Sequence, residues 1–446
     1  MHNSKRIPDA DRKKGYIHFD NRVTYNQVAR LVEDPDFIKK HAFYPLISTS
    51  IKSTMFRTVS DSNQEKCKVE KERPIAYAAH IDHRIYQYYG LLWSDRYEVA
   101  LERARLSEAI VAYRPGKHLS NVTGAAKAID YIRSLGGDAI ILTGDFSDFF
   151  SSLDHEYLKR AVRSLFDDGR LPDDHYKVLM SVIRYSCWPL EELLKIRGLD
   201  YSSEKRIRKS MRILNKSQKH ILSKSEFREN KDRCIEKHWK EEPRGIPQGL
   251  AVSGVLSNIY MLETDSAIAN CLGECGGFYS RYCDDFIVVL PWDKRSCITR
   301  VVNILKQVPG VTLHPEKCRL FRMVGKTVYS VVDDADFGLG KETHISYLGF
   351  DFDGRVVTLR ARTTGRFFNR YYRSMRRIWR RRKAATKRQI WSIYRRFTEK
   401  GNCPKTSFGN RNFLSYVSRA QDAFPNDPID KPFEDMFRRI RRDLLR

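Results

Sequence analysis

The clearest pattern in the chain is an alternation of apolar and polar positions on either side of an acidic pair. Residues 278–282 and 286–290 form two apolar, β-prone arms, and Asp284 and Asp285 lie between them. Acidic residues are uncommon inside strands, so the pattern predicts a β-hairpin that carries two carboxylates at its tip. An ordinary turn explains most such pairs, and this one gains chemical meaning only if another acid approaches it.

Asp145 is the candidate for that further acid. It directly precedes Phe146, and it closely follows the apolar run 139–142, which predicts a buried strand. Carboxylates on two adjacent strands can hold two divalent cations for in-line phosphoryl displacement. We therefore expect Asp145, Asp284 and Asp285 to meet. Asp148 should face away because side chains alternate along a strand, and we expect it to be non-catalytic.

Other segments predict helices and a loop around these strands. Apolar residues at helical spacing predict helices through 81–92 and 158–166, and a further helix across 125–134. Residues 244–254 contain glycines and a proline, which predict a loop with exposed backbone, and Ser253 is placed to start the next helix. A glycine-rich loop alone is a weak functional signal.

Charge changes this picture because it is concentrated. Lys and Arg exceed Asp and Glu by 81 − 55 = 26, which indicates a polyanionic partner such as nucleic acid. Residues 195–244 predict a basic helical insertion, for which a solvated face without a partner is an equal alternative. Residues 360–400 predict a basic helix with one aromatic face. Such a helix can also dock on membranes, but counterion release from phosphates is the preferred explanation.

The remaining composition points to a protein of the cytoplasm. No apolar segment approaches the length of about 20 residues needed to span a bilayer, so we expect no membrane association. The nine cysteines are scattered and odd in number, without zinc-like spacing, and are expected to be reduced thiols. Oligomeric state is left open.

Several motifs together resemble those of reverse transcriptases, over about residues 70–355. The resemblance implies an α+β, right-hand polymerase fold with fingers, an antiparallel-sheet palm and a helical thumb. The motifs occur in the family's order: Asp145 before Phe149-Phe150, then Gly245-x-Pro247-Gln248-Gly249, Tyr282-Cys283-Asp284-Asp285, Lys317, and Leu348-Gly349.

The same resemblance implies roles for individual residues. Asp145 and Asp284 would ligate two Mg²⁺ ions, with Asp285 as the third acid and the backbone carbonyl of Phe146 assisting. Phe150 would be the aromatic gate that selects dNTPs, with a buried core ring as the alternative. The other expected nucleotide contacts are Arg73, Gln248, Gly249 and Lys317. The expected nucleic-acid contacts are the primer-grip residues Leu348 and Gly349, and Arg376, Arg377, Arg380 and Arg381.

Within the family, the chain most resembles the bacterial defence-associated and abortive-infection enzymes of prokaryotes. That resemblance implies RNA-directed DNA synthesis from dNTPs in anti-phage defence, with a non-coding RNA template, a nascent DNA strand and a companion protein as partners. Template-independent or protein-primed DNA synthesis, use of ribonucleotides, and an inactive nucleic-acid-binding scaffold are the alternatives.

The motifs divide the chain into five expected segments. They are an N-terminal extension with fingers (1–135), a first part of the palm (136–190), a basic helical insertion (191–244), a second part of the palm (245–355) and a basic helical thumb (356–446).

Overall fold

The computed structural model describes residues 5–58, 66–240, 242–332, 336–380, 385–399 and 412–445. The chain divides into two compact units, each made of several segments. Unit 1 comprises residues 1–107, 147–266 and 307–312, and unit 2 comprises residues 108–146, 267–306 and 313–446. Helices and antiparallel sheet occur together, so the predicted α+β class is confirmed.

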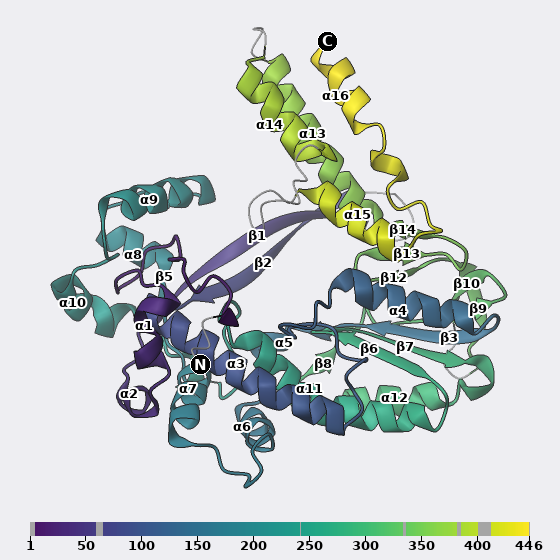
Figure 1. Ribbon diagram of the computed structural model, residues 1–446, viewed down its shortest axis with the longest axis horizontal. Coiled ribbons are helices and arrows are strands. Elements are labelled where there is room, and N and C mark those ends of the chain that lie inside the picture. The colour runs from purple at the N-terminus through teal and green to yellow at the C-terminus, as the bar shows by residue number, and fades with distance from the viewer. Residues whose placement is uncertain are drawn as a thin grey trace. The chain divides into compact units, whose positions relative to one another are not determined.

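Unit 1 is mainly helical, with a long two-stranded ribbon (Figure 1). In the ribbon β1 (Leu46–Thr58) pairs antiparallel with β2 (Lys66–Tyr77), and β5 (Cys187–Pro189) adds a third, parallel strand to β1. The helix expected through residues 81–92 is present and extends over His80–Arg103 as α3. The other helices of unit 1 are α1 (Tyr25–Val32), α2 (Pro35–Lys40), α5 (Phe149–Ser152), α6 (His155–Arg163), α7 (Asp173–Ile183), α8 (Leu190–Ile196), α9 (Glu204–Ser217) and α10 (Lys224–Cys234).

Unit 2 is built on a six-stranded antiparallel sheet in the order β11-β10-β9-β3-β7-β6. The central strand β3 (Ala139–Gly144) is buried along its whole length, because it is covered on both faces. The predicted hairpin forms from β6 (Phe278–Tyr282) and β7 (Asp285–Pro291). The remaining sheet strands are β9 (Arg319–Val324), β10 (Thr327–Val331) and β11 (Leu339–Glu342).

One face of this sheet carries the main apolar core of unit 2. Ala139 and Ile141 of β3 pack there with Ile287 and Val289 of β7, below α4 (Asn121–Ser134), which lies along the sheet in Figure 1. A small sheet of β12 (Ile345–Tyr347), β13 (Phe350–Phe352) and β14 (Val357–Leu359) extends the same core.

The C-terminal part of unit 2 is helical, as expected for a thumb. Its helices are α13 (Ala361–Trp379), α14 (Lys387–Phe397), α15 (Phe413–Ala423) and α16 (Met436–Leu444), and α12 (Cys297–Lys306) follows the hairpin. The buried stripe of α13 is Phe367, Tyr371 and Met375, whereas Tyr372 and Trp379 are exposed. The aromatic face expected from the sequence is therefore only partly the packed face. Three of the described elements cross a unit boundary: β4 (Phe146–Ser147), β8 (Thr312–Leu313) and α11 (Ser253–Gly273).

The expectation of reduced thiols is wrong for one pair. Cys275, which follows α11, and Cys297, which begins α12, form a disulfide in unit 2. The β6–β7 hairpin between them returns the chain, so two cysteines 22 residues apart meet, which their spacing alone does not reveal. Within the described part of the chain, Cys187, Cys234, Cys271, Cys283 and Cys318 are free.

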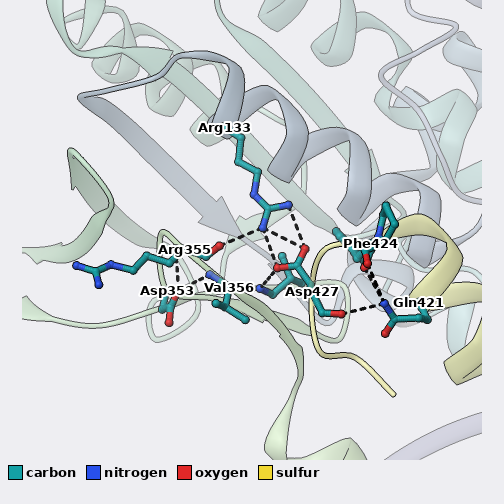
Figure 2. A network of polar contacts seen from close by, with 9 residues as sticks. Arg133, Asp353, Arg355, Val356, Gln421, Phe424 and Asp427 are labelled. Carbon is teal, nitrogen blue, oxygen red and sulfur yellow. Dashed lines mark hydrogen bonds and ion pairs between the residues drawn. The ribbon is translucent and has the colours of Figure 1, made fainter. Parts of the chain in front are cut away.

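A buried polar network joins the C-terminal helices to α4 (Figure 2). Asp427, which is almost fully buried, receives three hydrogen bonds from the two terminal nitrogens of Arg133 of α4, at 2.9, 3.1 and 3.1 Å. The Asp427 carboxylate also accepts the Val357 N–H at 2.8 Å, and Gln421 donates to the Asp427 carbonyl at 2.9 Å. The network therefore fixes the segment between α15 and α16 against α4 and against β14.

We expect Asp427→Ala to lower the free energy of unfolding of the chain by about 2–4 kcal/mol, because it leaves a half-buried guanidinium and a buried N–H without their acceptor. Thermal or denaturant unfolding measures this. Asp422→Ala, at an exposed position of α15, is the matched control and should change stability by less than about 0.5 kcal/mol. Equal effects of the two substitutions would contradict the structural role of the network.

Candidate active site

Strand pairing brings Asp145 to the acidic hairpin. In the β3–β7 ladder, Thr143 pairs with Ile287 and Gly144 with Phe286. Extending this antiparallel register by one residue places Asp145 opposite Asp285. The sequence prediction that Asp145 and the acidic pair meet therefore has a geometric basis within unit 2.

Gly144 is required for this pairing. A Cβ atom at position 144 would lie 2.1 Å from the Phe286 ring, so the ring fills the space that any other side chain would need. The Phe286 ring also lies against the Phe146 ring, with centroids 5.6 Å apart. The two rings can pack in this way only because Gly144 has no side chain. This packing fixes the ends of β3 and β7, next to which the acids lie.

The hairpin tip is a tight turn held by a buried arginine. Cys283 has a φ of 60°, in the left-handed region that non-glycine residues rarely adopt. Arg281, which is fully buried, donates from Nη1 to the Cys283 carbonyl at 2.8 Å. The backbone of Arg281 is fixed in turn by hydrogen bonds with Ala109 and Val111. Arg281 therefore holds the strained turn that presents Asp284 and Asp285.

The three carboxylates repel one another. Burial and then the charge of Asp145 raise the pKa of Asp284 above its ordinary value. Asp285 has an exposed side chain, and partial desolvation followed by the charges of Asp284 and Asp145 raises its pKa to about 7. Such mutual elevation occurs when like charges share a site, and it marks a place where a cation would be favoured.

Lys317 is the cation that the acids face in this structure. Its Nζ donates to Asp145 Oδ2, and its charge opposes the rise in the pKa of Asp285. The other oxygen of Asp145, Oδ1, is buried and has no hydrogen-bond partner in the described part of the chain. An orphaned buried oxygen beside further carboxylates is suited to a hard divalent cation.

Among the described residues, no group of three or more His, Cys, Asp or Glu side chains has the arrangement of a complete metal cage. At phosphoryl-transfer sites, one or two carboxylates bind Mg²⁺, and substrate phosphates and water complete its shell. Asp145 and Asp284 are the residues that would hold such an ion, with Asp285 beside them.

Tyr113 belongs to the segment Tyr113-Arg114-Pro115-Gly116, which resembles a finger motif of prokaryotic reverse transcriptases, but its place beside the hairpin tip was not predicted. Burial, and then the neighbouring Cys283 and Asp284, raise the pKa of Tyr113 above its ordinary value. Its own φ is 55°, and Arg114 beside it is buried and donates to the Ile110 carbonyl at 2.8 Å. The hydrogen bond from Arg114 helps to hold this turn. Spacing gave no signal that residues 109–113 lie against the hairpin.

The expected primer-grip residues form the turn of a second hairpin in unit 2. Leu348 and Gly349 link β12 to β13, and both have positive φ, 46° and 97°, as two-residue hairpin turns require. Asn121, at the start of α4, donates to the Leu348 carbonyl at 3.0 Å. This fixes the tip of the hairpin on a rigid helix.

The expected nucleotide contacts other than Lys317 lie in unit 1, where a single loop connects them. In the loop 244–249, Ile246 N–H donates to the Phe150 carbonyl and the Gln248 carbonyl accepts the Ala76 N–H, at 2.8 and 2.9 Å. Ala76 belongs to β2, which also carries the exposed Arg73. Hydrogen bonds of the 244–249 loop thus connect the segments that carry Arg73, Phe150 and Gln248.

Two glycines allow the 244–249 loop to adopt this conformation. Gly249 has a φ of 118°, and a Cβ there would lie 2.5 Å from the Ala76 carbonyl oxygen. Gly245 has a φ of 84°, and a Cβ there would lie 2.8 Å from the Ser151 carbonyl oxygen. Gln248 remains exposed at the surface of the loop, while Phe149 is buried and Phe150 is only partly so. Phe149 is therefore part of the core.

The expected thumb contacts are only partly visible. Arg376 and Arg377 are exposed in the last turn of α13, and the exposed Arg380 follows it as the C-cap. Arg381 lies outside the described residues.

An antiparallel sheet with acids at the adjoining ends of neighbouring strands, followed by a helical C-terminal part, is the arrangement of a polymerase palm and thumb. Residues 204–352 match the family model described as "Reverse transcriptase (RNA-dependent DNA polymerase)". This part of the chain therefore resembles a reverse-transcriptase domain. The match contains the acidic hairpin, Lys317 and Leu348-Gly349, and covers about a third of the chain.

Solved structures similar to this chain include fungal telomerases. Apo telomerase from Candida tropicalis truncated from the C-terminal domain is 14% identical with a TM-score of 0.41, and the match covers 76% of this chain and 61% of that one. Telomerase from Candida albicans in complex with a telomeric RNA fragment is 12% identical with a TM-score of 0.39, covering 92% and 67%. Similarity this low does not establish a shared activity. No curated protein matches the sequence.

The chain spans about three fifths of the length of the first of these telomerase chains. Among the described residues, no helix is both long and apolar enough to cross a bilayer.

We expect Asp284→Asn to raise the thermal unfolding temperature of the protein in EDTA, by about 2–4 °C for each kcal/mol of repulsion removed, because it neutralises one of three crowded carboxylates. Millimolar Mg²⁺ should raise the unfolding temperature of the wild type and leave that of the variant nearly unchanged.

Asp148→Asn is the matched control for that comparison. Asp148 is exposed and has a left-handed φ of 42°, which Asn also tolerates. Its substitution should leave the Mg²⁺ response intact. A wild-type protein whose unfolding temperature does not respond to Mg²⁺, or a response that survives Asp284→Asn, would contradict the assignment of the metal ligands.

Proposed function

We propose that this protein is an RNA-directed DNA polymerase that joins dNTPs to a growing DNA strand and acts in bacterial anti-phage defence. The observation that carries the polymerase part is the β3–β7 register, whose continuation by one residue sets Asp145 opposite Asp285. The Asp284-Asp285 turn lies within residues 204–352, which match the reverse-transcriptase family. A structural acidic turn has no need for a buried, unpartnered carboxylate oxygen such as Asp145 Oδ1.

The residues of the site take separate parts in the proposed reaction. Asp145 and Asp284 hold two Mg²⁺ ions, with Asp285 and the Phe146 carbonyl nearby. When bound, the ions lower the pKa of the primer 3′-hydroxyl and stabilise the charge of the leaving pyrophosphate. Lys317, which is paired with Asp145, is placed to give a proton to that pyrophosphate once the pair opens.

The unit 1 residues receive the incoming nucleotide. The exposed Arg73 binds the triphosphate, since a guanidinium matches phosphate oxygens in a bidentate manner. Gln248 and Gly249 contact the nucleotide through a loop whose backbone is already fixed by Ala76. The ring of Phe150 lies under the sugar and excludes a 2′-hydroxyl. Leu348 and Gly349 position the primer end, and Arg376, Arg377 and Arg380 bind the backbone of the duplex.

The anti-phage role, the cytoplasmic location, the non-coding RNA template and a companion protein are supported only by the resemblance to defence-associated bacterial enzymes. Template-independent synthesis is the competing proposal. Both are tested by the same assay, in which purified protein is given labelled dNTPs or rNTPs, Mg²⁺ or EDTA, and RNA or DNA template-primers.

We expect Asp284→Ala to reduce DNA synthesis on an RNA template by at least about 100-fold while RNA affinity changes little, because the carboxylate acts on the reacting groups and not on the backbone. In bacteria, the same substitution should abolish any reduction in phage plating. Asp148→Asn should retain both activities.

Three results would contradict the proposal. Synthesis retained by Asp284→Ala would remove the site assignment. Product formed equally well without added template, after co-purified RNA has been digested, would favour template-independent synthesis. Unchanged phage plating by an active polymerase would remove the defence role alone.

We expect Phe150→Ala to raise the use of rNTPs relative to dNTPs by about 10- to 200-fold, because a shape clash of this kind is worth about 1–3 kcal/mol. Single-nucleotide incorporation rates with each substrate give the ratio. The matched control is Phe149→Ala, which removes the neighbouring buried ring and should reduce stability without changing the ratio. An unchanged ratio of rNTP to dNTP use in Phe150→Ala would mean that Phe150 has only a packing role.

A further inference from the structure

Helix α9 of unit 1 has two distinct faces. Ile207, Met211 and Leu214 recur at i, i+4 and i+7, and they pack on the apolar core of unit 1 that contains Trp188 and Leu193. Leu214 is only 3% exposed. The apolar face of α9 is therefore already used inside the protein.

Polar contacts hold α9 in place as well. Ser203 caps its N-terminus, and Ser210 donates to the Asp200 carbonyl at 2.8 Å. Near the other end, Arg22 donates from Nη2 to Asn215 Oδ1 at 2.9 Å. With one face packed and both ends tied, the direction of the outer face is fixed relative to the core of unit 1.

The outer face carries a stripe of four cations, Lys205, Lys209, Arg212 and Lys216, which we call the α9 basic stripe. These residues recur at i, i+4, i+7 and i+11, so they lie on one side of the helix over about 16 Å. All four are exposed. In the described part of the chain their side chains form no hydrogen bond or salt bridge, although the charge of Lys209 is among those that lower the pKa of Asp200. By contrast, Arg206 pairs with Asp200 at 3.3 Å and Arg208 with Glu204 at 2.9 Å.

We propose that the α9 basic stripe binds the sugar–phosphate backbone of RNA. Regularly spaced, unpaired and mostly lysine cations suit a row of phosphates, since each contact releases counterions and needs no base to be read. A lipid surface fits less well, because an amphipathic helix docks on it through a broad exposed apolar face, and that of α9 is packed apart from Ile213, which is 46% exposed.

The choice of RNA over DNA rests on the proposed function. In RNA-directed synthesis the strand not yet copied is RNA, and it approaches from the side of the incoming nucleotide. The residues assigned to that nucleotide, Arg73, Phe150 and Gln248, belong to the same unit as α9. The product duplex is assigned instead to unit 2, through Leu348 and the thumb arginines.

The test uses the full chain with all four cations replaced, Lys205→Gln, Lys209→Gln, Arg212→Gln and Lys216→Gln. Binding of a labelled single-stranded RNA is measured by fluorescence anisotropy between about 50 and 200 mM salt. Four lost phosphate contacts should reduce the slope of log affinity against log salt by about 3, at roughly 0.7 for each contact. Thermal unfolding should show that the variant remains folded.

A matched control removes the same charge from the neighbouring helix α10, with Lys224→Gln, Arg228→Gln, Lys231→Gln and Arg233→Gln. These four residues are also exposed, but α10 carries three acids among them. The control should keep most of the wild-type salt slope. An equal loss in both variants would mean that net charge alone is responsible and would overturn the assignment.

Three further outcomes would also overturn it: an unchanged slope in the α9 variant, tighter stripe-dependent binding of single-stranded DNA of the same sequence, or stripe-dependent binding to anionic lipid vesicles. The result is independent of catalysis. Stripe-dependent RNA binding without DNA synthesis would contradict the proposed function alone. DNA synthesis together with an unchanged salt slope in the α9 variant would contradict this inference alone.

Discussion

The antiparallel pairing of β3 with β7 is the constraint on which the candidate site depends. It forces Asp145 towards Asp284 and Asp285, although like charges in a partly desolvated place repel one another. Backbone hydrogen bonds and a sheet core buried on both faces supply the energy that overcomes this repulsion. The sheet thus stores an electrostatic strain that a divalent cation would relieve.

Two cations moderate the strain in different ways. Arg281 is buried beneath the turn and fixes its backbone through the Cys283 carbonyl, so it positions the acids. Lys317 pairs directly with Asp145 and remains partly exposed, so its ammonium is free to move when another cation arrives. A buried arginine that fixes the turn and a partly exposed lysine that pairs with an acid thus have different parts in the site.

In unit 1 the candidate site residues are positioned by close contact between backbone segments, whereas in unit 2 they are positioned by strand register. Gly245 and Gly249 let the 244–249 loop lie against residues 150–151 and against β2, and no larger residue fits without moving a carbonyl. The same unit bears a basic helix whose apolar face is packed, so its charges are presented in a fixed direction. The positive charges behind the net charge of +26 are therefore unevenly distributed, because cations are arranged in rows on individual helices.

The sequence by itself determined the hairpin around Asp284 and Asp285, the buried strand before Asp145, the start of α11 at Ser253, and the places where charge gathers. These follow from local rules: alternation, helical spacing, capping and turn composition. Only the tertiary structure decided that Tyr113 and Arg281 support the turn, that Cys275 meets Cys297, and that Phe367 rather than Tyr372 is buried in α13. Contacts between residues far apart in the chain depend on how strands pair and helices pack, and no local pattern records that choice.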